Sequence, residues 1–217
     1  MPIKGSLGAI FAQSPDQVVS CDVVGFDEAA AGLVAFSDQP TTANAGLTRY
    51  TIDDPAMRYW SSDHTLTVKR NAVAITTGFT VEYPGGVVVF AEAQGPADTV
   101  TVSGTAVSIK VVGGCFNWAM EPVSDTRDAT RYASGGWREK QATLNTFVAT
   151  AKTYWWAGDW HRDLGKRLIL VLYPDNSDRR YEGYVLVSED SVETTVDVLI
   201  EETIGFTGQG PVYYRGT

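Results

Sequence analysis

The sequence is poor in the side chains from which reactive and metal-binding sites are built, because its 217 residues include only two histidines and two cysteines. A catalytic zinc needs three clustered protein ligands, and no spacing of that kind is present. The cysteines, Cys21 and Cys115, are too few for a disulfide framework. Both lie in apolar, strand-like segments, so we expect buried free thiols, with a single bridge between them as the less favoured alternative.

The common catalytic motifs are missing as well. No Gly-x-x-x-x-Gly-Lys-Ser/Thr or Gly-x-Ser-x-Gly sequence is present, so neither a phosphate-binding loop nor a nucleophile elbow is predicted. His161 and Asp163 are close in sequence, but such neighbours seldom converge on one site, and we interpret both His64 and His161 as surface residues. We therefore predict that the protein is not an enzyme and uses no metal or other cofactor.

Long hydrophobic runs are absent too. No apolar run approaches the roughly 18 to 20 residues that a membrane span needs, and the first residues lack the pattern of a secretion signal. We expect a protein made in the cytosol without a membrane anchor. The formal charge is −9, from 17 basic and 26 acidic residues. This balance argues against wrapping nucleic acid, which needs Lys and Arg. Solubility is the favoured interpretation of the charge, although a surface past which DNA moves without being held should also be neutral or acidic.

What is present is typical of a folded chain, with 44% hydrophobic and 20% charged residues. The length predicts a single domain over residues 1–217. Three segments without a clear period are expected to lie outside its main fold: an N-terminal arm over 1–15, a long loop over 25–62 and a C-terminal arm over 203–217. Ile10 and Phe11 would anchor the first arm. Tyr59 and Trp60 argue against disorder in the loop and favour its docking on a partner.

From residue 65 onward, apolar and polar residues alternate with a period of two, as in β-strands. Pro84, Gly85 and Gly86 supply a hairpin turn between two such strands. Further strands are predicted over residues 16–24, 98–103, 105–112, 167–173, 180–187 and 194–202. The segment 143–153 has apolar residues at helical spacing, but its β-branched threonines favour a strand.

One short helix is predicted over residues 159–167, with Asp159 as its N-cap. The expected fold class is therefore mainly β: an antiparallel sandwich or barrel with one short flanking helix and extended arms.

Aromatic residues are the strongest remaining signal, since residues 125–160 hold four of the six tryptophans. Trp, Tyr and Arg are enriched at the centres of protein interfaces. The predicted subunit contacts are large apolar residues of this segment, the arms and the loop: Ile10, Phe11, Met57, Tyr59, Trp60, Trp137, Trp156, Phe206, Tyr213 and Tyr214. Packing in a β core is the alternative for part of them. Trp60, Trp137 and Trp156 could instead form a platform on which sugars stack.

Several short segments occur in a characteristic order. They are Asp-Ala-Thr-Arg-Tyr over 128–132, Ser-Gly-Gly-Trp-Arg-Glu over 134–139, Leu144, the strand 168–173, Tyr-Glu-Gly-Tyr-Val over 181–185 and Glu-Thr-Ile-Gly-Phe-Thr-Gly-Gln-Gly over 202–210. In this order the chain resembles the major tail (tail tube) proteins of long-tailed bacteriophages. The resemblance covers residues 120–211, with weaker support over 65–112, and the segment 25–62 departs from it.

The resemblance implies a β-sandwich or barrel that self-assembles into sixfold rings, stacked into a hollow tube by a long loop and terminal arms. It implies a virion protein, assembled in the host cytoplasm, with further copies of itself and other tail proteins (tape measure, terminator, baseplate) as partners. DNA would pass through the lumen without sequence-specific binding, and no membrane would be involved. The alternatives are a carbohydrate-binding β-sandwich module and another tail protein of the same fold, such as a terminator or a baseplate ring protein.

Overall fold

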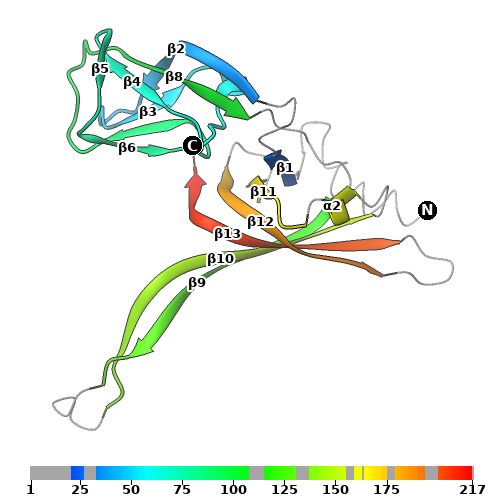
Figure 1. Cartoon of the computed structure of the whole chain (residues 1–217). Coiled ribbons are helices and arrows are strands. Elements are labelled where there is room, and N and C mark those ends of the chain that lie inside the picture. The colour runs from blue at the N-terminus through cyan, green and yellow to red at the C-terminus, as the bar shows by residue number, and fades with distance from the viewer. Residues whose placement is uncertain are drawn as a thin grey trace. The chain divides into compact units, whose positions relative to one another are not determined.

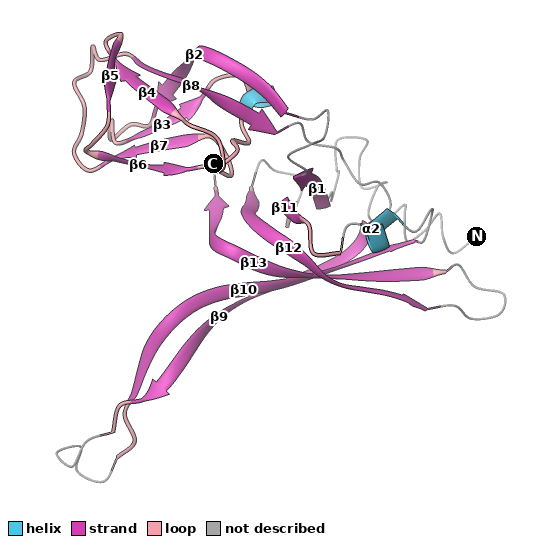
Figure 2. Cartoon of the chain, in the orientation of Figure 1, coloured by secondary structure: helices cyan, strands magenta, loops and turns pink. Residues whose placement is uncertain are grey.

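The computed structural model describes residues 21–26, 33–107, 115–130, 137–154, 159–162, 164–174, 179–193 and 200–216, and strands dominate them (Figure 2). The chain divides into two compact units. One, here the hairpin unit, combines residues 1–22 with 112–217; the other, here the inserted unit, comprises residues 23–111. Each unit is built on its own β-sheet, and the expectation of a single domain stays a prediction.

The hairpin unit contains a six-stranded sheet (Figure 1). In spatial order its strands are β1 (Cys21–Phe26), β11 (Arg167–Leu172), β12 (Arg180–Glu193), β13 (Glu201–Arg215), β10 (Lys140–Tyr154) and β9 (Cys115–Asp128). The pairs from β11 through to β9 are antiparallel. β1 crosses the boundary between the units but hydrogen-bonds to β11, so it belongs to this sheet.

Two strands define the core of this sheet. β11 is buried at five consecutive positions, from Leu168 to Leu172, as expected for a strand covered on both faces. β10 alternates instead: Phe147, Ala149 and Ala151 are buried, while the residues between them are exposed. One face of β10 therefore packs on the core and the other is free in the single chain.

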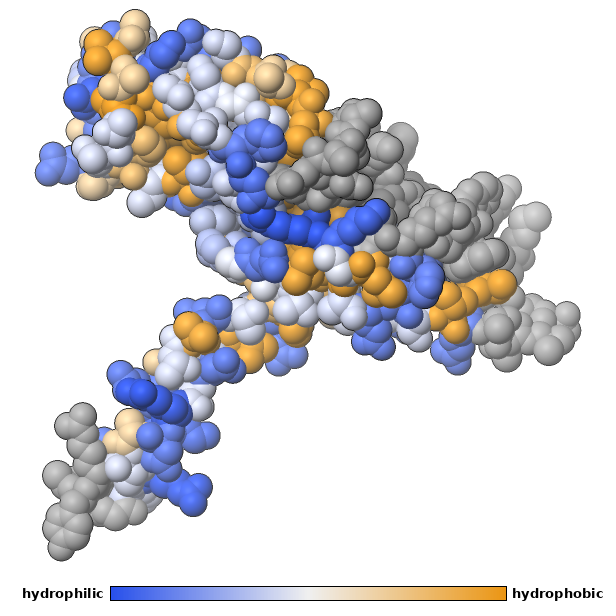
Figure 3. Space-filling view, viewed as in Figure 1, coloured by the Kyte–Doolittle hydropathy of each residue, from blue (hydrophilic) through white to orange (hydrophobic). Residues whose placement is uncertain are grey.

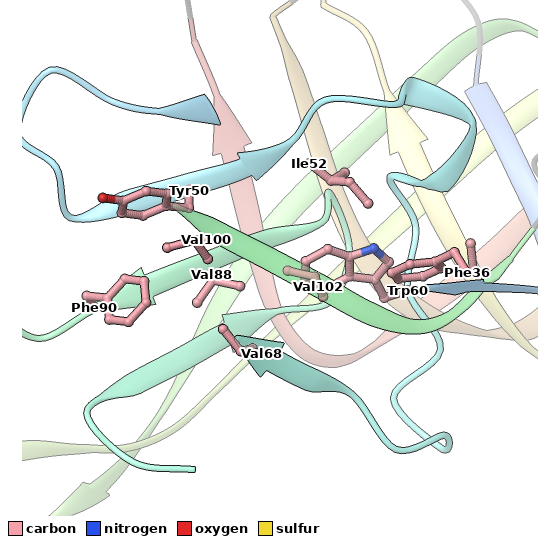
Figure 4. Close-up of a cluster of buried hydrophobic side chains, with 10 residues drawn as sticks. Phe36, Tyr50, Ile52, Trp60, Val68, Val88, Phe90, Val100 and Val102 are labelled. Carbon is pink, nitrogen blue, oxygen red and sulfur yellow. The ribbon is translucent and has the colours of Figure 1, made fainter. Parts of the chain in front are cut away.

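The inserted unit contains a seven-stranded sheet. In spatial order its strands are β5 (Val73–Ile75), β4 (Thr67–Arg70), β8 (Val100–Val107), β2 (Leu33–Ala43), β3 (Arg49–Ile52), β7 (Val87–Phe90) and β6 (Phe79–Glu82). Its core gathers Trp60, Phe36 and Tyr50 with valines from several strands (Figure 4). Burial of such side chains stabilises a fold by roughly 1.5–3 kcal/mol each, which gives this unit a core of its own.

The mainly antiparallel β fold predicted from the sequence is confirmed. The hairpin across residues 84–86 is formed by β6 and β7, and the segment 143–153 is a strand, within β10. The predicted helix exists as α2 (Asp159–Arg162), which is shorter than expected. The predicted strand pair across Gly104 is wrong, because Gly104 lies inside the single strand β8, where it makes room for Leu66 and Phe36.

Two of the segments expected outside the main fold belong to the sheets. The expected loop 25–62 is wrong as drawn, because it contains β2, β3 and the 3-10 turn η1 (Pro55–Met57). The sequence shows no alternation of apolar and polar residues there, because β2 buries only one residue fully, Phe36. The expected C-terminal arm is β13, which pairs with both β10 and β12. The N-terminal arm over 1–15 and residues 194–199 of the predicted strand lie outside the described residues.

Cys115 is buried and disulfide-bonded, so the expectation of a free thiol is wrong for this residue. The chain has one other cysteine, Cys21, at the start of β1.

Candidate assembly surface

The hairpin of β9 and β10 extends beyond the rest of its sheet (Figure 1). β10 pairs with β13 from Val148 to Tyr154, but with β9 from Lys140 onward. Among the described strands, residues 140–147 therefore pair with β9 alone. Eight residues of strand correspond to about 26 Å, so the two-stranded ribbon is long compared with its support.

The root of the ribbon is held by Phe147, which is 2% exposed. Its ring lies against two glycines of neighbouring strands, Gly208 in β13 and Gly183 in β12. A Cβ atom at Gly208 would lie 2.3 Å from Cδ1 of Phe147, and one at Gly183 would lie 2.8 Å from Cζ. Real carbon atoms do not approach so closely. Glycine at these positions thus gives the ring a place where the ribbon leaves the sheet.

A β-bulge interrupts the ribbon just beyond this root. Ala142 pairs with Thr126 and Asn145 with Ser124, so two residues of β10 oppose one of β9. The bulge is fixed by a hydrogen bond that the Thr143 hydroxyl donates to the carbonyl oxygen of Asp125, at 3.0 Å. Bulges redirect side chains. Leu144, in the bulge, is 72% exposed.

The far end of the ribbon is fixed by polar contacts. The Asp128 carboxylate accepts a hydrogen bond from the Thr130 backbone N–H at 2.8 Å, and the Thr130 hydroxyl accepts one from the Glu139 N–H at 3.0 Å. Hydrogen bonds from Thr130 hold the pKa of Asp128 below its usual value. The backbone of Ala129 also bonds to Glu139. These contacts order both chains of the ribbon up to the residues beside Trp137.

Trp137 is the most exposed large hydrophobic residue among those described, at 80%. The surface of the ribbon is mainly hydrophilic, with isolated apolar residues (Figure 3). Large exposed apolar side chains on a polar background are typical of contact sites for other proteins. Val148, 40% exposed on the free face of β10, continues the apolar positions back to the sheet.

β9 is one edge of its sheet as far as the described strands go, and it is 14 residues long. An edge strand presents unpaired backbone N–H and C=O groups, with which another strand can pair. Pro122 interrupts the row, because proline has no N–H to donate. Among the described strands, this edge is therefore unpaired on both sides of residue 122, and Pro122 blocks pairing at that point.

The structure places the predicted contact residues in different environments. Trp137 and Tyr214 are exposed, and Met57 and Tyr213 are half-buried. Tyr59, Trp60 and Phe206 are instead core residues, at 5%, 0% and 2% exposure. Ile10, Phe11 and Trp156 lie outside the described residues.

These core positions differ from the docking role that the sequence suggested for Trp60. Its indole packs in the inserted unit 6.1 Å from the ring of Phe36, between ring centroids. Phe206 packs edge-on against Trp160 in the hairpin unit, at 5.9 Å. A sugar platform made of Trp60, Trp137 and Trp156 is wrong, because Trp60 has no exposed surface. Leu144, which is also exposed, is not among the predicted contact residues; its position among polar residues of a strand was the available signal.

Each histidine lies near one polar side chain of the described residues. His64 forms a hydrogen bond with Ser61 at 2.8 Å, and His161 Nδ1 lies 4.0 Å from a carboxylate oxygen of Asp190. Within the described residues, no group of three or more His, Cys, Asp or Glu side chains is placed to hold a metal ion. Nor does the described part of the chain contain a helix long and apolar enough to cross a membrane.

The geometry defines a mainly β protein with a projecting hairpin and a long edge strand. No protein-family model and no curated protein matches the chain. Several solved structures are similar to part of it, and three of them are named here. The virion of a native gene transfer agent particle is 12% identical over 50% of this chain and 89% of that chain, with a TM-score of 0.40. The tail of an empty gene transfer agent particle with C6 symmetry is 10% identical over 50% of this chain and 87% of that chain, with a TM-score of 0.40. The SPP1 tail tube is 15% identical over 51% of this chain and 69% of that chain, with a TM-score of 0.39.

Proposed function

We propose that this chain is a structural protein of a phage-type virion tail, whose copies assemble into stacked hexameric rings that form a hollow tube. The observation that carries the proposal is the ribbon of β9 and β10. A two-stranded ribbon is marginally stable in water, and this one presents Trp137 and Leu144 to solvent. Packing against another copy removes both problems at once.

Ring closure would use the edges of the six-stranded sheet. The open edge of β9 in one copy is a template for a strand of the next, and repetition of one such contact around an axis closes a ring. The free face of β10, with Val148 and Lys152 exposed, is available for the same contact. The ribbon ends, with Trp137, would reach the neighbouring ring. Tyr214 and the half-buried Tyr213 and Met57 remain proposed contacts, as do Ile10, Phe11 and Trp156.

DNA would pass through the lumen of the tube without sequence-specific binding. The charge of −9 supports this part of the proposal, because an acidic wall repels phosphates. Glu193 of β12 and Glu201 of β13 stand directly opposite each other in the sheet. Like charges in that arrangement destabilise a sheet, so the pair suits a surface selected for its charge.

The proposed partners are further copies of this chain and the tape-measure, terminator and baseplate proteins of the same tail, with no enzymatic role. The location would be the virion, after assembly in the host cytoplasm. A terminator or baseplate ring protein of the same fold is the remaining alternative. Copy number per particle distinguishes them, because a tube subunit is among the most abundant proteins of a virion.

The proposal is tested by negative-stain electron microscopy and sedimentation of the purified chain. We expect rings or tubes, and their loss in a variant carrying Trp137→Ala and Leu144→Ser. Both side chains are at least 72% exposed, so the variant should keep its circular dichroism and unfolding temperature.

Val73→Ser is the matched control, because Val73 is 66% exposed but lies in β5 of the inserted unit. Its assembly should equal that of the unmodified chain. Normal tubes from the double variant would remove the ribbon from the assembly contacts. Monomers of the unmodified chain at every salt and protein concentration, even with tail initiator complexes added, would refute the tail-tube proposal.

A further inference from the structure

The ribbon of β9 and β10 loses its support because β13 turns away from it. Val148 of β10 pairs with Thr207 of β13, and no residue of β10 before Val148 pairs with β13. Continued at the same register, Arg215 at the end of β13 would stand opposite Lys140 at the start of β10. β13 is therefore long enough to cover the whole ribbon, but its residues 208–215 lie along β12 instead.

The change of direction is built into β13 by a bulge. In the register of β12 and β13, residues 209–211 stand opposite Tyr184 alone. Gly210, within the bulge, has a φ of 104°, which glycine adopts without the steric penalty of a side chain. Bulges bend a strand and increase its twist. Figure 1 shows β13 and the ribbon diverging, so the fold itself uncovers the edge of β10.

The uncovered edge of β10 is weakly protected against pairing with another strand. Proteins usually block a strand edge with charges, prolines and bulges. Residues 140–147 contain no proline and one charged residue, Lys140. The bulge of β10 interrupts the edge at Thr143 and Leu144, but the register is continuous on both sides of it. Most of this edge can therefore accept a further strand.

We propose that this edge of β10 pairs with β9 of the next copy, so that the ribbons of neighbouring copies join into one closed sheet within the tail-tube assembly proposed above, on which this inference rests. Among the described strands, β9 carries the other unpaired edge of the same ribbon. The two edges therefore run along the same stretch of ribbon in every copy. Rotation about a ring axis preserves strand direction, so β10 would meet the β9 of the next copy antiparallel, as it meets its own β9.

The two edges are also opposite in charge. Residues 123–128 of β9 contain two aspartates and one arginine, which gives a net charge of −1, whereas the single lysine gives residues 140–147 of β10 a net charge of +1. Copies with a total charge of −9 repel each other, so a contact between segments of opposite charge favours correct encounter. Pairing on both sides also places each ribbon inside a larger sheet, which is more stable than two strands alone.

Disulfide trapping between copies of the full chain tests the pairing. One preparation carries Thr126→Cys in β9, and each of the others carries one substitution in β10: Gln141→Cys, Ala142→Cys, Asn145→Cys or Thr146→Cys. These side chains are exposed or half-buried, so folding is not at risk. The β9 preparation is assembled with each β10 preparation in turn and mildly oxidised. We expect disulfide-linked dimers in one or two of the mixtures, because a disulfide needs Cα atoms within about 7 Å, as in adjacent strands.

Each preparation assembled alone is the matched control. Equivalent residues of neighbouring copies would be two strands apart, or about 10 Å, so no dimers are expected. Val73→Cys, exposed in the inserted unit, should give none with Thr126→Cys either. Particles that assemble from every mixture without dimers would overturn the ribbon pairing and leave the tail-tube proposal intact. Dimers in mixtures that form neither rings nor tubes would support the pairing and refute the tube.

Hydrogen exchange of the unmodified chain decides the case in which a substitution itself weakens assembly. We expect the backbone N–H groups of residues 140–147 that do not face β9 to exchange at least about tenfold more slowly in assembled particles than in the dilute single chain. Unchanged exchange there would overturn the proposal. Slower exchange without dimers in any mixture would assign the edge to another strand, such as residues 208–215 of β13, and would overturn β9 as its partner.

Discussion

The ring of Phe147 occupies the space in which a side chain at Gly208 would begin, with 2.3 Å between Cδ1 of Phe147 and a Cβ built at Gly208. The two residues belong to adjacent strands, β10 and β13, at the point where β13 stops pairing with β10 and the ribbon continues with β9 and β10 alone. Gly208 therefore contributes to the anchoring of the ribbon, although it lies in the main sheet.

Gly208→Ala should displace the Phe147 ring and loosen the root of the ribbon. Forcing one extra carbon into a packed core usually costs about 1–3 kcal/mol of unfolding free energy. We expect that loss in urea denaturation, together with weaker assembly. Gly46→Ala is the matched control, because a Cβ at Gly46 would have its nearest neighbour at 3.7 Å. A Gly208 variant as stable as the Gly46 variant would contradict the proposed anchoring.

The sequence predicted those strands whose pattern of apolar and polar residues matches the burial of their two faces. The alternation of β10 and the continuous apolar run of β11 follow directly from what each face contacts. β13 was missed in part because glycines interrupt its pattern, and two of them, Gly205 and Gly208, face side chains of other strands, Glu189 of β12 and Phe147 of β10. No local pattern contains that information.

The same limit applies to the candidate sites. Trp137 was predicted at a contact surface and is exposed, whereas Trp60, with equal local grounds, is buried. Glu182 is fully buried, and its Oε2 accepts a hydrogen bond from Arg215 Nε at 2.9 Å. Nothing in the sequence distinguishes it as the buried one among the 26 acidic residues. Which side chain is covered depends on which distant strands pair, and a single sequence does not fix that.

Glu193→Lys should stabilise the hairpin unit. Glu193 faces Glu201 across β12 and β13, and like charges directly opposite each other destabilise a sheet, whereas opposite charges contribute about 0.2–1 kcal/mol. We expect a higher urea midpoint at low salt and a smaller gain at high salt, because screening weakens both interactions. An unchanged midpoint at low salt would show that the two carboxylates do not interact.

The carboxylate of Asp98 should stabilise the loop over residues 95–98 of the inserted unit, and only above acidic pH. Hydrogen bonds from Asn71 and from the Gly95 backbone hold the pKa of Asp98 below its ordinary value of 3.8. A depressed pKa in the folded state contributes stability that is present above the ordinary value and is lost as the pH falls through the folded one. Asp98→Asn should therefore lower the urea midpoint at neutral pH, and the difference should shrink near pH 2.

An NMR titration of the Asp98 carboxyl group provides the direct measurement, with a midpoint below 3.8 as the expected result. Asp53→Asn is a suitable control, because Asp53 is an exposed carboxylate of the same unit. A difference between the Asp98 variant and the unmodified chain that stays constant from neutral to acidic pH would contradict this role.

Cys115 should resist alkylation until it is reduced, because it is disulfide-bonded. Burial alone would also protect it, so the reaction is carried out in guanidinium chloride, where the chain is unfolded. We expect no iodoacetamide adduct by intact-mass spectrometry without reductant, and adducts after reduction. Adduct formation at Cys115 in the unreduced, unfolded protein would show that the bond is absent.

Removing the inserted unit should leave the rest of the protein able to fold. Leu33 and Val107 are paired neighbours in antiparallel strands, so their Cα atoms are about 5 Å apart, and a short Gly/Ser linker can replace the residues between them. We expect the shortened chain to keep a cooperative unfolding transition and to assemble through the ribbon and β9, without the contact proposed for Met57, while losing the fluorescence of the buried Trp60. A shortened chain that is unfolded would show that the sheet of β9 to β13 depends on the inserted unit. A shortened chain that folds but stays monomeric would place essential assembly contacts within residues 33–107.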